Sequence, residues 1–128
     1  MRGLLIGLAL ALAAPPTLAQ TRQEEQRLQE RLQQQREWCL APGPTNGQAI
    51  EGCTALIESA RETSASKAVA YHHRGFAYER EGWLAQAIAD YTTAIALEPD
   101  NAGPYDNRGA AYEKKASATP PSPTTARH

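Results

Sequence analysis

The stretch RGFAYE at residues 74–79 returns 34 residues later as RGAAYE at residues 108–113, and Tyr71 is echoed by Tyr105 at the same spacing. A motif that recurs at a fixed period of this length is typical of helical units stacked one on the next, because one unit cannot bury its apolar face alone. The repeat therefore predicts an all-α chain whose core is shared between neighbouring units.

Small and aromatic residues occupy the interval between the two copies at a characteristic spacing. Together with the first copy, this interval resembles the tetratricopeptide repeat, a unit of two packed helices, and the second copy resembles the start of another unit. The resemblance implies a short tetratricopeptide-like solenoid of about five helices built as helical hairpins. It rests on these positions: Tyr71, Gly75, Tyr78, Gly82, Ala87, Tyr91, Ala94 and Pro99, then Tyr105, Gly109 and Tyr112.

Several residues of the regular repeat have predicted packing roles. Gly75 and Ala87 are expected to let the two helices approach closely, and Gly82 to take a left-handed turn between them. Pro99 should prevent the second helix from continuing. Many family members place Asp or Asn directly after the turn glycine as a helix cap, whereas this chain has Trp83. We therefore expect an uncapped helix start with a large ring near solvent.

The first 19 residues are predicted to be a signal peptide. A single basic residue, Arg2, precedes an apolar run over residues 4–14, and the small residues Thr17 and Ala19 precede the expected cleavage site. The eleven residues of the run fall short of the roughly 20 needed to span a bilayer, which disfavours an uncleaved anchor. We expect a periplasmic or secreted protein with no stable membrane insertion after cleavage.

The charge balance and the cysteine content limit which partners and which cysteine chemistry the chain can have. With 13 Lys and Arg against 14 Asp and Glu, the chain lacks the basic patch that nucleic acid or an anionic membrane would require. Its two cysteines, Cys39 and Cys53, would enter an oxidising compartment on export, where a pair usually forms a disulfide. The sequence has no haem-attachment motif and no second cysteine pair for structural zinc. A structural disulfide is therefore predicted.

Residues 20–66 are predicted to hold a polar helix followed by a degenerate earlier repeat. Good helix formers fill residues 21–38, where Leu28 and Leu32 could begin a coiled-coil seam that the next positions do not continue. A solvated helix is therefore preferred over an oligomerising coil. The apolar residues between positions 49 and 60 recur at helical spacing and predict a second helix.

The degenerate repeat is indicated by the tripeptide Gln-Ala-Ile, which begins at residue 48 and again at residue 86. The offset of 38 is four residues more than the period. By this correspondence Cys53 replaces the aromatic Tyr91, and Cys39 lies beside Leu40, the counterpart of Tyr78. In the family these two aromatic positions face each other across a helix pair. The resemblance therefore implies a Cys39–Cys53 bridge in place of an aromatic contact.

Residues 67–116 are predicted to form the regular repeat and one further helix. That last helix, over about residues 101–116, resembles the first helix of a repeat without its partner and is expected to cap the stack. A chain shortened from a longer array is the alternative that the sequence leaves open. Residues 117–128 are rich in Ala, Thr, Pro and Ser and have no apolar stripe, so we expect a disordered tail.

Motifs for catalysis are absent from the sequence. It has no Gly-rich phosphate loop, no Gly-x-Ser-x-Gly elbow and no His-Glu-x-x-His pair, so neither an enzyme nor a cofactor is predicted. The adjacent His72 and His73 diverge by about 100° on a helix, which disfavours a shared metal. Two groove-lining histidines are the preferred interpretation, and no metal site is predicted.

The family resemblance supplies the expected binding site. First helices of successive repeats line a concave groove that holds an extended peptide or a partner helix. Phe76 and Arg80 are the favoured anchors, because aromatic and Arg side chains often dominate binding energy. We thus expect an exported bacterial adaptor or scaffold module for another protein or peptide; the alternative is a structural repeat protein that self-associates. The predicted partner-binding residues are His72, His73, Phe76, Arg80, Asp106 and Asn107, with Val69, Glu79, Ala110 and Glu113 at neighbouring groove positions.

Overall fold

The computed structural model describes residues 13–118, which form five helices and no strand. This confirms the all-α class and the expected number of helices. Most of the predicted signal peptide, residues 1–12, and the predicted tail from residue 119 onward lie outside the described residues. The helices are α1 (Leu18–Leu40), α2 (Asn46–Glu58), α3 (Ser64–Arg80), α4 (Leu84–Leu97) and α5 (Ala102–Ala118).

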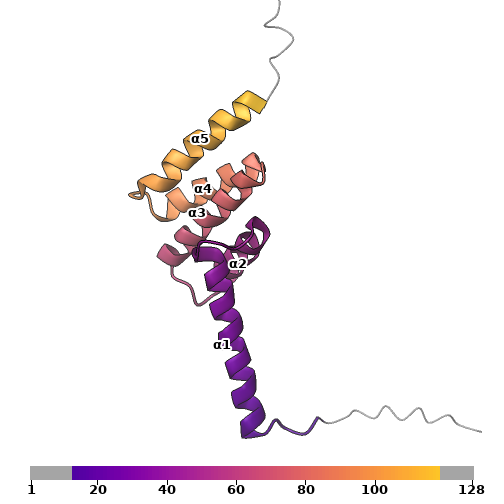
Figure 1. The fold of residues 1–128 in the computed structure, drawn as a ribbon. Coiled ribbons are helices and arrows are strands. Elements are labelled where there is room, and N and C mark those ends of the chain that lie inside the picture. The colour runs from indigo at the N-terminus through magenta and orange to yellow at the C-terminus, as the bar shows by residue number, and fades with distance from the viewer. Residues whose placement is uncertain (1–12, 119–128) are drawn as a thin grey trace, which may run out of the picture.

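The five helices stack in chain order. Each packs on the next, and α3 also contacts both α1 and α5. In Figure 1, α5 lies at one end of the stack, and most of α1 projects beyond the other end. The odd-numbered helices are therefore neighbours in space although other helices separate them along the chain, as in a solenoid of helical hairpins.

Helix α1 begins earlier than its composition suggested. Thr17 and Gln20 form a capping box, in which each side chain accepts a hydrogen bond from the other residue's backbone N–H. This box satisfies two of the N–H groups that every helix start leaves free. The helix consequently runs through the expected cleavage site after Ala19. Its projecting half is solvated, with Leu28 43% exposed.

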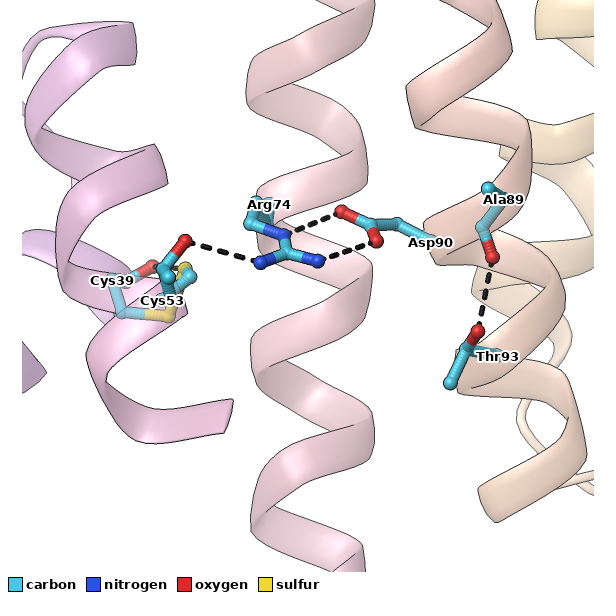
Figure 2. A network of polar contacts seen from close by, with 7 residues as sticks. Cys39, Cys53, Arg74, Ala89, Asp90 and Thr93 are labelled. Carbon is cyan, nitrogen blue, oxygen red and sulfur yellow. Dashed lines mark hydrogen bonds and ion pairs between the residues drawn. A yellow bond between two sulfur atoms is a disulfide. The ribbon is translucent and has the colours of Figure 1, made fainter. Parts of the chain in front are cut away.

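A disulfide between Cys39 and Cys53 joins the end of α1 to α2, and both cysteines are buried (Figure 2). They form one core cluster with Leu56 and Ala70. Gly52 brings the two helices together, because an added Cβ would lie 2.5 Å from the Gln35 carbonyl oxygen. The predicted disulfide is therefore present, beside a close helix contact that the sequence analysis did not identify.

The hairpin of α3 and α4 has the close helix approach and the left-handed turn that the sequence predicted. A Cβ on Gly75 would lie 2.8 Å from the Tyr91 ring, which shows how closely the two helices approach. Gly82 has a φ of 81°, the left-handed conformation expected of the turn. Trp83 precedes α4 without a side-chain cap and is 50% exposed, as the departure from the family pattern indicated. The second core cluster, around Tyr91, Ala87, Ile88 and Ala111, joins this hairpin to α5.

The last helix extends slightly further than expected. Helix α5 continues to Ala118, whereas a disordered tail was predicted from Ser117. The side chain of Ser117 donates a hydrogen bond to the Glu113 carbonyl one turn earlier. That bond is compatible with one more helical turn, and the first proline of the following segment comes only at position 120. Helix α5 therefore includes residues 117 and 118, which had been assigned to the tail, while the tail prediction for residues 119–128 lies outside the described residues.

Candidate functional site

Two hollows adjoin along one face of α3. The larger, of about 390 Å³, lies between α3 and the segment that connects α1 to α2. The smaller, of about 180 Å³, lies between α3 and α5 and is lined by His72, His73, Phe76 and Asn107. His73 and Phe76 line both hollows, so the two adjoin, and we call them together the groove.

Five of the six predicted partner-binding residues meet at this groove. His72, His73, Phe76 and Asn107 surround the smaller hollow, while Arg80 lines the larger one. Asp106 is exposed but lines neither hollow. The residues come together because successive turns of α3 place positions three and four apart on one face, and α5 packs beside that face.

Phe76 is the most exposed large hydrophobic side chain of the groove, at 48%. The Arg80 guanidinium lies 5.8 Å from the centroid of its ring, one helical turn further along α3. This distance is within the range of a cation–π contact, which holds the guanidinium over the ring. An exposed ring on a rigid helix, with a charged group held above it, provides both an apolar and an ionic contact for a partner.

His72 is fixed between α3 and α5. The Asn107 amide nitrogen lies 2.9 Å from His72 Nε2, and because an amide NH₂ only donates, Nε2 is the acceptor and the proton resides on Nδ1. Burial, with a smaller contribution from repulsion by His73, lowers the pKa of His72 from its ordinary value of 6.5. His72 is therefore neutral at pH 7 and joins the two helices that line the smaller hollow.

Glu79 has a structural contact rather than a place in the groove, although the family pattern implied a groove position. Its carboxylate accepts a hydrogen bond from Tyr91 Oη at 2.6 Å and one from Lys114 Nζ at 2.5 Å. Burial opposes ionisation, but these two bonds prevail and lower the pKa of Glu79. Burial and the hydrogen bond to Glu79 raise the pKa of Tyr91. The carboxylate therefore links α3, α4 and α5.

One side of the larger hollow was missed by sequence reasoning. Trp38, Leu40 and the connection from Ala41 to Asn46 line it opposite α3. The side chain of Asn46 donates a 2.9 Å hydrogen bond to Glu81 and so ties this segment to the end of α3. The two prolines of the connection had been interpreted only as a helix stop. The degenerate repeat was the available signal, since it places the end of α1 beside α3.

The described residues contain neither a metal-type cluster of side chains nor a helix that could span a membrane. Within residues 13–118, no three His, Cys, Asp or Glu side chains are grouped as a metal ion would require. No helix in the same range is both long and apolar enough to cross a membrane. Each buried side-chain nitrogen or oxygen in this part of the chain has a hydrogen-bond partner. The groove of α3 is the candidate site.

Comparison with known proteins gives one match. Residues 80–115 match a family model described as a TPR repeat. The matched stretch contains α4 and most of α5, together with the turns that precede them. Neither the curated proteins nor the solved structures that were compared give a match to the chain.

Proposed function

We propose that this chain is a tetratricopeptide-repeat protein and an adaptor that binds a peptide or a helix of another protein in the groove of α3, because residues 80–115 match a TPR repeat model and the five helices stack in chain order. Repeats of this family generally mediate protein–protein interactions. The proposed role is binding alone, without catalysis or a cofactor.

The observation that carries the proposal is the exposure of Phe76 where the two hollows meet. A ring that is 48% exposed and belongs to a helix packed on both sides is already ordered before a partner arrives. Less conformational entropy is then lost on binding than with a flexible segment. Aromatic side chains in such positions are frequent hot spots of protein interfaces.

The chemistry of the groove favours a partner with one apolar and one acidic side chain. The apolar side chain would pack on Phe76, and the acidic one would pair with Arg80, which has no ion pair within residues 13–118. A carboxylate fits a guanidinium through two parallel hydrogen bonds, which gives geometric selectivity in addition to charge attraction. Asn107 and His73 add polar groups in the smaller hollow.

Mutation of the two anchors tests this proposal. Phe76→Ala combined with Arg80→Ala should weaken capture of the partner by at least about tenfold, as expected for hot-spot residues. Both side chains are exposed, so circular dichroism should show an unchanged fold. Gln86→Ala, exposed on α4 and outside both hollows, is the matched control and should leave capture unchanged. Equal capture by all three proteins would exclude the groove as the binding site.

We also propose that the protein is exported to the periplasm or secreted. The buried Cys39–Cys53 disulfide supports this, because such bonds persist in oxidising compartments. Cleavage after Ala19 would remove the Thr17 cap, so α1 of the mature protein would start at or after Gln20 with a frayed first turn. The intact mass of protein recovered from the producing cell tests export, and a mass that retains Met1 would contradict it.

Self-association is a second candidate function, favoured by the projecting half of α1. Leu28, which remains after cleavage, is 43% exposed there, without a partner helix inside the described chain. Sedimentation at several concentrations separates the two functions, because the mass of a self-associating protein rises with concentration. A constant monomer mass would leave the adaptor function and remove this alternative.

A further inference from the structure

Helix α5 makes the same contacts with the helix that precedes it as α3 does. The Arg74 guanidinium lies 5.5 Å from the centroid of the Tyr71 ring, and that of Arg108 lies 5.7 Å from Tyr105. Arg74 Nη1 donates to Thr54 on the preceding helix at 3.1 Å, and Arg108 Nη1 donates to Thr92 in the same way at 3.3 Å. Each arginine therefore joins its own helix to the helix that precedes it in the stack.

The two helices differ in their contacts on the side that faces the next position in the stack. On α3, Asp90 of the next helix accepts hydrogen bonds from Arg74 Nε and Nη2, and the Tyr91 ring lies against Gly75. On α5, no described residue places a carboxylate on Arg108 or a ring against Gly109. Arg108 has no ion pair within residues 13–118, and a Cβ on Gly109 would meet nothing within 4 Å.

The same face of α5 also exposes two large rings, because Tyr105 is 42% and Tyr112 is 53% exposed. Their counterparts on α3, Tyr71 and Tyr78, are partly buried in the hairpin with α4. We define the end face as Tyr105, Arg108, Gly109 and Tyr112. It presents two aromatic rings and a glycine that allows close approach. It also presents the Arg108 guanidinium, whose Nε and Nη2 are available to a carboxylate.

We propose that the end face docks an amphipathic helix of another protein that carries a small residue, a carboxylate three residues later and an aromatic ring directly after the carboxylate. This is the pattern of Ala87, Asp90 and Tyr91, which cover the equivalent face of α3. The small residue allows the helices to approach, the ring fills the space above Gly109, and the carboxylate binds Arg108 Nε and Nη2. This docking is separate from binding in the groove.

Two other occupants fit the end face less well. A second copy of the chain has the required pattern on α4, but its Ala87, Asp90 and Tyr91 are buried in its own hairpin. The ten residues given after Ala118 contain three prolines and no Asp or Glu, so their sequence does not match the proposed pattern. A helix from a different protein satisfies both the shape and the charge.

The test uses a synthetic peptide with the sequence of residues 81–100 as the probe and the full chain as the receptor. Fluorescence anisotropy should show saturable binding. Replacing the peptide residue that corresponds to Asp90 by asparagine, or Arg108→Gln in the chain, should each weaken binding by about tenfold, as expected for a charge-assisted pair. Both changes together should cost little more than either alone, because they remove the same contact.

Gly109→Leu is the sharpest variant, because the space around Gly109 lets the fold accept the side chain while the docked helix cannot. It should abolish binding of the peptide with no loss of thermal stability. Ala110→Leu adds the same bulk to an exposed position one residue further along and should leave binding intact. Phe76→Ala with Arg80→Ala should also leave it intact, so that this proposal and the groove proposal fail separately. An absence of peptide binding, or binding that survives Gly109→Leu, would overturn the proposal.

Discussion

The Arg74 guanidinium donates hydrogen bonds to both carboxylate oxygens of Asp90, from Nε to Oδ2 at 2.7 Å and from Nη2 to Oδ1 at 2.9 Å (Figure 2). The side chains of this pair are only 17% and 8% exposed. Arg74 also reaches Thr54 on α2, so one guanidinium connects three consecutive helices. The hydrogen bonds that Arg74 donates to Asp90 outweigh burial and raise the pKa of Arg74, so the guanidinium stays charged.

Removing the charge of Asp90 should destabilise the fold. Asp90→Asn leaves Arg74 buried without a counter-charge, and we expect a loss of about 3 kcal/mol in the free energy of unfolding. Urea unfolding followed by circular dichroism measures it. The double variant Arg74→Met with Asp90→Leu should recover part of the loss, because it leaves no unpaired charge. A single variant as stable as the parent would mean that the pair does not hold the hairpin.

Gly75 and Gly109 occupy equivalent positions in two helices and should respond oppositely to alanine. Gly75→Ala places a Cβ 2.8 Å from the Tyr91 ring, so the hairpin must open and thermal stability should fall. Gly109→Ala meets nothing and gains helix propensity, which should stabilise the fold by roughly 0.5–1 kcal/mol. Differential scanning calorimetry compares the two variants. Equal shifts of the same sign would contradict the described packing.

The disulfide should account for a large part of the stability of the α1–α2 end. Cys39 and Cys53 are 14 residues apart, and closing a loop of that size contributes about 3 kcal/mol in the chain-entropy model. The double variant Cys39→Ala with Cys53→Ala should lower the unfolding midpoint and release α1, while α3 and α4 remain helical. Hydrogen exchange resolves the two regions. Retained protection of α1 in the variant would show that packing alone holds it.

Protonation of His72 should weaken the fold as the pH falls. Its folded pKa lies below the ordinary value of 6.5, so the unfolded chain takes up a proton first. Stability should be complete above pH 6.5 and decline as the pH falls from there toward the folded pKa. His72 faces Tyr91 of α4, Asn107 and Gly103 of α5, and His73 on its own helix.

Two variants separate burial from charge repulsion in this pH response. His72→Gln should flatten the dependence of the unfolding midpoint between about pH 7 and 5, because the titrating group is gone. His73→Gln should keep most of the slope, since burial is the larger cause of the shift. An identical slope in His72→Gln and the parent would assign the pH dependence to other groups.

The repeat itself could be predicted because its signals are local or strictly periodic. Gly82 takes the left-handed conformation of the turn between α3 and α4, and Gly75 and Ala87 lie where these two helices approach closely. The degenerate repeat followed from an offset of 38 residues, which placed the two bridged cysteines across one helix pair. These conclusions needed the order of residues along the chain and the family resemblance that this order carries.

The rest depended on distances between helices, which the sequence pattern does not encode. Glu79 resembled a groove residue, but its side chain turns toward Tyr91 and Lys114, because a buried carboxylate with two donors is more stable there. Gly52 and the connection after α1 gained their roles from the angle at which α1 meets α2. The absence of a cover on the end face became visible only by comparing the surroundings of Gly109 with those of Gly75.

Photo-crosslinking from the groove tests the central claim of a protein-binding groove on α3 most directly. A photoreactive amino acid replaces Phe76 in one protein and the exposed Ala89 of α4, outside both hollows, in another. Irradiation in an extract of the producing cell should yield a discrete protein adduct from position 76 alone. Excess unlabelled parent chain should suppress the adduct, and Phe76→Ala with Arg80→Ala should suppress it far less. The same adduct from both positions, or equal suppression by both competitors, would contradict the account.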